Sequence, residues 1–136
     1  MITAAVAFVL GLLAISVPVA PVDAPHADYR VELNRVRYEL PAVSYSAELS
    51  RLAQMRADDL AREQPTRLHH AGAFAGTAEN LWRSNWAPEP WQVMEDWLAS
   101  PSHTTILLLA DVRAAGWGFA QDTRGFWYVV LLLGYR

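Results

Sequence analysis

The stretch WLASPSH at residues 97–103 predicts a break between two helices that is followed at once by a histidine. Pro101 cannot donate a backbone hydrogen bond and disfavours helical geometry at Ser100, so the helix before it is expected to end there. Ser102 is a favourable N-cap for a new short helix that starts near His103. The sequence therefore predicts that the imidazole of His103 lies at a helix start and faces a cleft.

Three amphipathic helices are expected around this break, over residues 29–39, 47–62 and 91–99. Asp28 and Ser46 are suitable N-caps for the first two. The second helix has the clearest apolar stripe, formed by Leu49, Leu52, Ala53, Arg56, Ala57 and Leu60. The stripe of the third helix is formed by Trp91, Met94, Trp97 and Leu98. Each stripe predicts that one face of its helix packs on a core.

The C-terminal part of the chain changes to a strand pattern. Residues 115–120 and 126–133 are rich in strand-forming residues, and residues 121–125 read as a hairpin loop between them. The second strand is apolar on both faces, and such a strand needs cover on each side. We therefore expect an α+β domain with a sheet between two helical layers. Residues 78–82 are expected to be a short extended or helical piece, after a loop over 64–77.

The N-terminal segment is apolar enough to enter a membrane. Residues 2–20 contain no charged residue and have about the length needed to cross a hydrocarbon core. A cleaved signal peptide would have a positively charged start, which is missing here, and cleavage after Ala20 or Ala24 would leave a proline directly after the cut. An uncleaved signal anchor is therefore favoured. The expected organisation is a signal anchor or signal peptide over 1–20, a spacer over 21–27 and a globular domain over 28–136.

The charge of the chain argues against one class of partner. The 136 residues include eleven basic residues, all arginine, and fourteen acidic residues, for a net charge of -3 and no basic run. A nucleic-acid-binding surface needs a positive footprint, so nucleic acid is not expected as a partner. The chain has no cysteine and therefore does not indicate its redox compartment.

Six short segments, in the right order, resemble the bacterial SCP-like branch of the CAP superfamily, which is named after cysteine-rich secretory proteins, antigen 5 and plant pathogenesis-related proteins. The segments that resemble family motifs are Leu33-Asn34 with Arg37, Leu40-Pro41-Ala42-Val43, Leu68-His69-His70-Ala71-Gly72, Ala78-Glu79-Asn80-Leu81, Trp97 to His103, and Gly116-Trp117-Gly118. The resemblance covers about residues 29–134. It implies a three-layer α-β-α sandwich with a small antiparallel sheet, and a location on the outer side of the cytoplasmic membrane.

The resemblance also implies a site, because two histidines and two glutamates of the family meet in a cleft and can hold a divalent metal. His70, Glu79 and His103 match three of these positions, and Ser100 stands in place of the second glutamate. Two imidazoles and one carboxylate could supply three ligands of a tetrahedral site with one open position, as in a catalytic zinc site.

Three interpretations of this residue set are weighed. In the first, Glu79 and a histidine form a hydrogen-bonded structural pair that ties the loop to the helices. In the second, His70, His103 and Glu79 bind a divalent metal such as zinc, and in the third they perform acid-base catalysis. The incomplete ligand set favours the structural pair. The serines near His103 are better explained as residues at the end of one helix and the start of the next than as nucleophiles, so no catalytic residue is assigned.

Six tryptophans in a domain of this size need an explanation. Core packing is the default for Trp97 and Trp117. Trp82 and Trp86 are expected to mark a partner surface, and the alternatives are core packing, sugar stacking and a belt at a bilayer.

These features favour a membrane-anchored, extracytoplasmic bacterial domain that acts as a non-catalytic accessory or binding subunit of a membrane-associated complex. The basis is the apolar segment 2–20, the incomplete ligand set and the surplus of tryptophans. The alternatives are an exported His/Glu or metal-dependent hydrolase of a cell-envelope substrate, and a lipid-binding protein. If residues 1–20 are cleaved, the domain is secreted. The fold alone does not decide among these functions.

Overall fold

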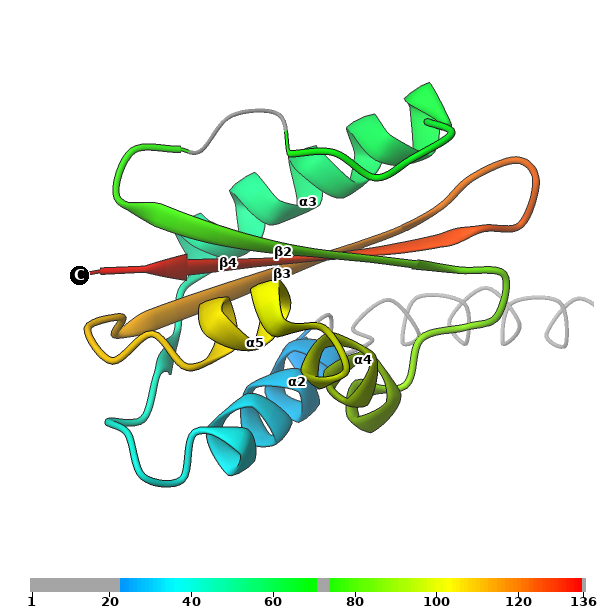
Figure 1. The fold of residues 1–136 in the computed structure, drawn as a ribbon. Helices are drawn as coiled ribbons and strands as arrows, with labels where there is room; N and C mark the ends of the chain where they lie inside the picture. The colour runs from blue at the N-terminus through cyan, green and yellow to red at the C-terminus, as the bar shows by residue number, and fades with distance from the viewer. Residues whose placement is uncertain (1–22, 71–73, 136) are drawn as a thin grey trace, which may run out of the picture.

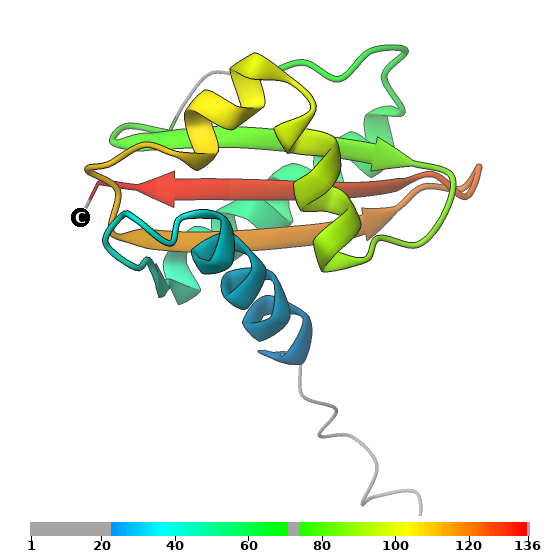
Figure 2. The same ribbon diagram turned by 60° about the horizontal axis from the view of Figure 1, so that its bottom comes forward.

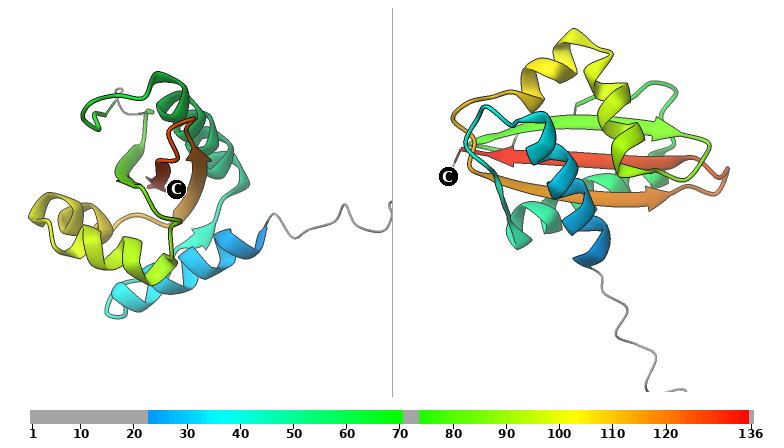
Figure 3. Two further views of the ribbon diagram at one scale, coloured as in Figure 1. Left: turned by 90° about the vertical axis from the view of Figure 1, so that its right-hand side faces the viewer. Right: turned by 90° about the horizontal axis from the view of Figure 1, so that it is seen from below.

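The computed structural model describes residues 23–70 and 74–135, which form a sheet between two helical layers (Figure 1). The elements are α2 (Asp23–Val36), β1 (Ser44–Tyr45), α3 (Ala47–Glu63), β2 (Thr77–Ser84), α4 (Pro90–Leu98), α5 (Pro101–Leu107), β3 (Ala114–Gln121) and β4 (Trp127–Gly134). Helix α3 covers one face of the sheet, and α2, α4 and α5 cover the other (Figures 1 and 3). The expected α+β class and the three layers are confirmed for this part of the chain.

The sheet is mixed, whereas a small antiparallel sheet was expected. Its strand order is β1-β3-β4-β2. The three long strands pair antiparallel, but Ser44 and Tyr45 of β1 pair parallel with Ala114 and Ala115 of β3. The expectation is therefore correct for the long strands and wrong for β1. Residues 78–82, left open between extended and helical, lie in edge strand β2.

Strand β4 lies inside the sheet and is buried on both faces, as its composition predicts. Successive side chains of a strand point to opposite faces, so one strand can serve two cores. The core under α2, α4 and α5 contains Val129, Leu131 and Leu133. The core under α3 contains Tyr128, Val130 and Leu132. All six side chains are at most 1% exposed, which makes β4 the common wall of both cores.

Helix α3 packs directly on the backbone of β3. Gly116 and Gly118 have no side chains to separate the two elements, and a Cβ atom at either position would collide with backbone atoms of α3. Gln54 of α3 then reaches the strand edge, where its Nε2 donates to the Phe119 carbonyl oxygen at 2.7 Å and its Oε1 accepts from the Phe119 amide at 3.0 Å. The close approach therefore aligns α3 along β3.

The first helix begins earlier than expected. Helix α2 starts at Asp23, so residues 23–27 of the expected spacer are helical. Pro25 is tolerated there because an amide in the first turn has no partner within the helix. The apolar segment 2–20 lies outside the described residues. Within the residues that are described, no helix is both long enough and apolar enough to span a membrane.

The break between α4 and α5 is where the sequence predicts it, but its cap is different. Ser100 has an extended backbone (φ -118°, ψ 124°) directly before α5, and Pro101 is the first helical residue. Proline is well suited to this position because its φ is already helical. Ser100 is therefore the N-cap, and the assignment of Ser102 as the cap is wrong. The Oγ atoms of the two serines lie 3.2 Å apart.

Candidate functional site

Three side chains from separate elements meet on the edge strand β2. Glu79 lies on β2, Arg56 on α3, and His70 in the segment that follows α3. Atom Oε1 of Glu79 lies 2.7 Å from Nδ1 of His70, and its Oε2 lies 3.7 Å from Nε of Arg56. The exposed fraction of the side chain is 60% for His70, 10% for Glu79 and 6% for Arg56. The carboxylate therefore lies between a buried guanidinium and an exposed imidazole.

Arg56 is the site residue that the sequence analysis misses. Its position on the apolar stripe of α3 assigns it to the core, and it is indeed buried. It also donates from Nη2 to the carbonyl oxygen of His69, which ties the segment after α3 to the helix. A buried charge needs a partner of opposite charge. An arginine on a core-facing stripe was therefore a signal for a nearby carboxylate, which the structure identifies as Glu79.

His103 approaches the same site from the other layer. It lies in α5, on the opposite face of the sheet from α3 (Figure 1). Burial, and next the charge of nearby His70, lower the pKa of His103, so the two imidazoles are close enough to interact electrostatically. Asn80 of β2 holds this turn, because its Nδ2 donates to the backbone oxygen of His103 at 3.2 Å.

The metal site expected at His70, Glu79 and His103 stays a prediction. Within residues 23–70 and 74–135, no group of three His, Cys, Asp or Glu side chains is arranged to hold a metal ion. Oε1 of Glu79 pairs with Nδ1 of His70, and Nε of Arg56 lies 3.7 Å from Oε2, so a metal bound by Glu79 would lie beside a guanidinium charge. The geometry contains the hydrogen-bonded His70–Glu79 pair that the structural interpretation requires.

The two tryptophans expected to mark a partner surface have different environments. Trp82 is only 5% exposed, and its Nε1 donates to Oδ2 of Asp96 in α4 at 2.8 Å. The assignment of Trp82 to a surface is therefore wrong, because its side chain points from β2 into the core. Trp86 is 64% exposed in the connection between β2 and α4. Trp91, expected in the apolar stripe of α4, is 54% exposed at the start of that helix.

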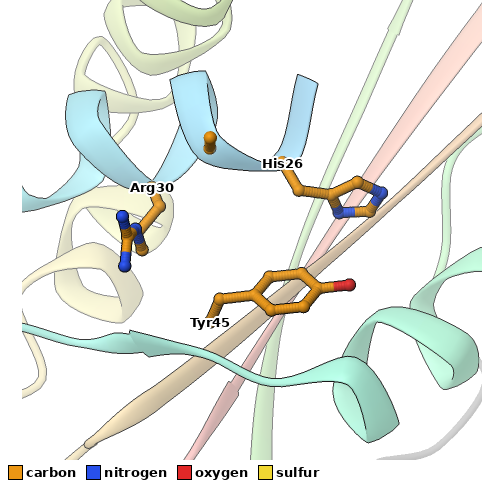
Figure 4. Close-up of a pocket in the computed structure, with 4 residues that line it drawn as sticks. His26, Arg30 and Tyr45 are labelled. Carbon is orange, nitrogen blue, oxygen red and sulfur yellow. The ribbon is translucent and has the colours of Figure 1, made fainter. Parts of the chain in front are cut away.

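A separate concavity lies beside the first turns of α2 (Figure 4). It has a volume of about 240 Å³ and is lined by His26, Ala27, Arg30 and Tyr45. The rings of His26 and Tyr45 pack edge to face, with centroids 5.5 Å apart. Figure 4 shows His26 and Arg30 of α2 facing the same space as Tyr45 of β1. Sequence reasoning gives these residues no common role, because β1 has only two residues and no pattern.

Several solved structures share this fold. An outer surface protein from Borrelia burgdorferi is 21% identical, with a TM-score of 0.69, and the match covers 87% of this chain and 96% of that one. NaASP2, solved with Zn2+, is 12% identical, with a TM-score of 0.63 and coverage of 80% and 78%. An extracellular SCP-domain protein from Bacillus anthracis str. Ames is 13% identical, with a TM-score of 0.61 and coverage of 88% and 45%.

The family is given by a sequence comparison. A family model described as "CAP: Cysteine-rich secretory protein family" matches residues 24–132. No significant match to a curated protein is found. The family match covers most of the chain, including β2 with Glu79 and α5 with His103, and agrees with the resemblance found in the motifs. This chain therefore belongs to the CAP family of cysteine-rich secretory proteins.

Proposed function

We propose that this chain is a membrane-tethered, extracytoplasmic CAP domain that acts as a non-catalytic accessory or binding subunit of a membrane-associated complex. The observation that carries the proposal is the state of Glu79, whose two carboxylate oxygens face His70 and Arg56 of the same chain. The charge of this carboxylate is therefore already compensated within the chain, by the guanidinium of Arg56 and the imidazole of His70, which leaves less of it for a bound cation. The arrangement therefore suits a structural contact better than a reaction centre. We call the contacts among Arg56, Glu79 and His70 the clamp.

The clamp holds the segment that follows α3 against the edge strand β2. Arg56 links α3 to Glu79 of β2 and to the backbone of His69, and His70 closes the other side of the carboxylate. These contacts hold the segment after α3 against the edge strand. Arg56 is the deeply buried member, so its charge depends on Glu79 for compensation. His70 is mostly exposed and contributes less to the stability of the fold.

The proposed location rests on two observations. Residues 2–20 are apolar and uncharged, which suits a membrane tether. Two proteins of similar fold are described as an outer surface protein and as an extracellular protein. Together they support a domain held on the outer side of the membrane by its N-terminal segment.

A metal-dependent hydrolase is the second candidate. The similar protein NaASP2 was solved with Zn2+, and the imidazoles of His70 and His103 interact electrostatically in this chain. The lowered pKa of His103, caused first by burial, favours the neutral imidazole, which is the form that binds a metal. In this candidate Nε2 of His70 would bind the metal while its Nδ1 stays bonded to Glu79, and a binding measurement tests whether a metal is held.

The test compares the wild-type chain with a His70→Ala/His103→Ala variant, expressed in the native membrane and extracted in mild detergent. We expect both proteins to migrate with the same large assembly after size separation, and intact mass spectrometry to find Met1 retained. His69→Ala is the matched control, because His69 is a neighbouring exposed histidine. A small lone particle, or a mature N-terminus at residue 21 or 25, would contradict the proposal.

Zinc titration of the purified full chain provides the second measurement. We expect no stoichiometric binding by calorimetry in the wild-type chain. One zinc ion per chain, lost in His70→Ala/His103→Ala and kept in His69→Ala, would favour the hydrolase instead. Circular dichroism of each variant checks that the fold is retained.

A further inference from the structure

Three apolar side chains are exposed on α2, at the start of α4 and in the connection that leads into α4. Val31 is 59% exposed, Trp86 64% and Trp91 54%. Val31 of α2 and Trp91 of α4 line one groove of about 230 Å³. Trp86 lies in the connection that leads into α4, five residues before Trp91. We call Val31, Trp86 and Trp91 the tryptophan surface.

The tryptophan surface involves α2, the helix that follows the apolar segment in the sequence. The start of α4 lies beside the middle of α2 (Figure 2), where Pro90 and Trp91 line the groove with Asp28, Val31 and Glu32. Residues 21 and 22 separate the segment 2–20 from Asp23, and the three steps from residue 20 to Asp23 span at most about 11 Å. Val31 is eight residues further along α2, or about 12 Å at helical rise. If residues 2–20 are in a bilayer, Val31 of the surface lies within about 23 Å of its boundary.

We propose that the tryptophan surface docks on the headgroup region of the same bilayer that holds residues 2–20, so that the domain rests on the lipid instead of moving freely on its tether. This inference rests on the proposed membrane tether. Tryptophan favours the interface between headgroups and hydrocarbon because its ring is apolar and its indole N–H is polar. Val31 adds apolar area between the helices.

The charges near the surface indicate which lipid it meets. Asp28 and Glu32 line the groove together with Trp91, so strongly anionic headgroups would repel this end of the domain. The other flank of α2 carries Arg30, beside Tyr45 in the concavity of Figure 4. Arginine and tyrosine can both donate to a phosphate oxygen, which zwitterionic phospholipids also present. We therefore assign a zwitterionic phospholipid surface as the partner.

The test uses spin labels on the full chain in phosphatidylcholine vesicles. The chain has no cysteine, so single cysteines can be introduced at chosen positions. Ala87→Cys reports on the tryptophan surface and leaves Trp86 and Trp91 in place. Ser16→Cys reports on the apolar segment. Tyr38→Cys lies beyond the other end of α2, where the native side chain is 79% exposed, and is the aqueous control.

The readout is the accessibility of each label to oxygen, which is enriched in lipid, and to a water-soluble nickel complex. We expect the labels at 16 and 87 to be protected from nickel and open to oxygen, and the label at 38 to show the reverse. Adding Trp86→Ser and Trp91→Ser to Ala87→Cys should raise its nickel accessibility several-fold. Vesicles with added phosphatidylglycerol should raise it as well, because of the acidic residues.

The outcomes separate docking from tethering. A label at 16 in lipid with a label at 87 in water would overturn the docking and leave the tether intact. A label at 16 in water would overturn both. Protection of the label at 87 from both reagents would indicate a protein contact and would overturn lipid docking in favour of a protein partner. Near-ultraviolet circular dichroism checks that the serine substitutions, both at exposed positions, keep the fold.

Discussion

The two faces of the sheet are covered in opposite ways. On one face, α3 approaches β3 so closely that Gly116 and Gly118 leave no room for a side chain. On the other face, large side chains fill the space, and Trp97 and Trp117 are at most 1% exposed. Packing on the first face requires that residues 116 and 118 have no side chain. Packing on the second face requires the volume of the buried tryptophan rings. Substitutions should therefore damage the two faces by different mechanisms.

Polar contacts differ between the faces as well. On the α3 face, Oγ of Ser50 accepts a hydrogen bond from the Trp117 amide at 3.2 Å, so the helix and the strand backbone are joined directly. On the other face, Nε1 of Trp97 donates to the carbonyl oxygen of Leu81 at 2.9 Å. The helix on the first face bonds to the strand backbone through a small polar side chain. The helix on the second face does so through the indole N–H of a large ring.

The largest effect is expected for Gly118→Ala. The added Cβ would collide with backbone atoms of Ala53 and Gln54, which cannot rotate away as a side chain could. We expect a loss of more than about 4 kcal/mol in the free energy of unfolding, or failure to fold. Thermal unfolding of the full chain in mild detergent, followed by circular dichroism, measures the effect.

Gly76→Ala is the matched control for this substitution. Gly76 has a positive φ of 75° but nothing within 4 Å of an added Cβ, so only the backbone conformation is penalised, by about 1–2 kcal/mol. If the two substitutions cost the same, the close approach of α3 is not what makes residue 118 a glycine. Ala53→Gly should not rescue Gly118→Ala, because the clash is with backbone atoms.

The second prediction concerns the face filled by large side chains. Trp97→Ala removes a buried ring and leaves the Leu81 carbonyl oxygen without its donor. The transfer and cavity effects together should cost about 3–5 kcal/mol. Trp97→Phe keeps most of the volume and should recover part of this loss. Equal losses for both variants in thermal unfolding would show that the hydrogen bond, and not the volume, dominates.

The third prediction concerns the β3–β4 hairpin, which borders the α3 core. Burial would raise the pKa of Asp122, but hydrogen bonds from Arg124, Tyr128 and two backbone amides lower it to about 2. Asp122→Ala should cost about 1–3 kcal/mol at neutral pH, because Tyr128 loses its buried acceptor. Tyr128→Phe, which removes only the hydroxyl donor, is the partial control.

The pH dependence of this effect has a definite sign. The pKa of Asp122 is lower in the folded chain than its ordinary value of 3.8, so the stabilisation is complete above that value and is lost as the pH falls towards 2. The stability difference between wild type and Asp122→Ala should therefore be constant near neutral pH and shrink between about pH 4 and pH 2. A constant difference across that range would show that the carboxylate is not held by these bonds. Urea unfolding of both proteins at each pH measures this stability difference.

Local patterns predicted most of the fold. The stripe of α3, the hairpin loop and the break at Pro101 depend on residues close in sequence, and the structure contains all three. The parallel pairing of β1 depends on two residues that carry no pattern, so it could not be predicted. Trp91 was misplaced because its position in the first turn of α4, and not its helical spacing, leaves it exposed.

The site was predictable only in part for a similar reason. The motifs brought His70, Glu79 and His103 together through a family resemblance, while Arg56 had only its odd place on an apolar stripe as a signal. Its ion pair with Glu79 joins residues far apart in the sequence, and sequence spacing does not report such contacts. Trp82 was misassigned because residues 78–82 alone do not distinguish a strand from a helix.

The smallest effect sharpens the comparison of the two faces. Tyr29 of α2 is 2% exposed, and its hydroxyl has no hydrogen-bond partner among the described residues. Burial, and next the charge of Glu89, raise the pKa of Tyr29, so the hydroxyl stays protonated and unpaired. Tyr29→Phe should therefore change the free energy of unfolding by less than about 0.5 kcal/mol, or increase it slightly, because no hydrogen bond is lost.

Ser50→Ala on the α3 face removes one hydroxyl that is hydrogen-bonded and should cost about 1 kcal/mol. If Tyr29→Phe were the more damaging of the two in urea unfolding, the face filled by large side chains would also depend on polar contacts, and the contrast between the faces would fail.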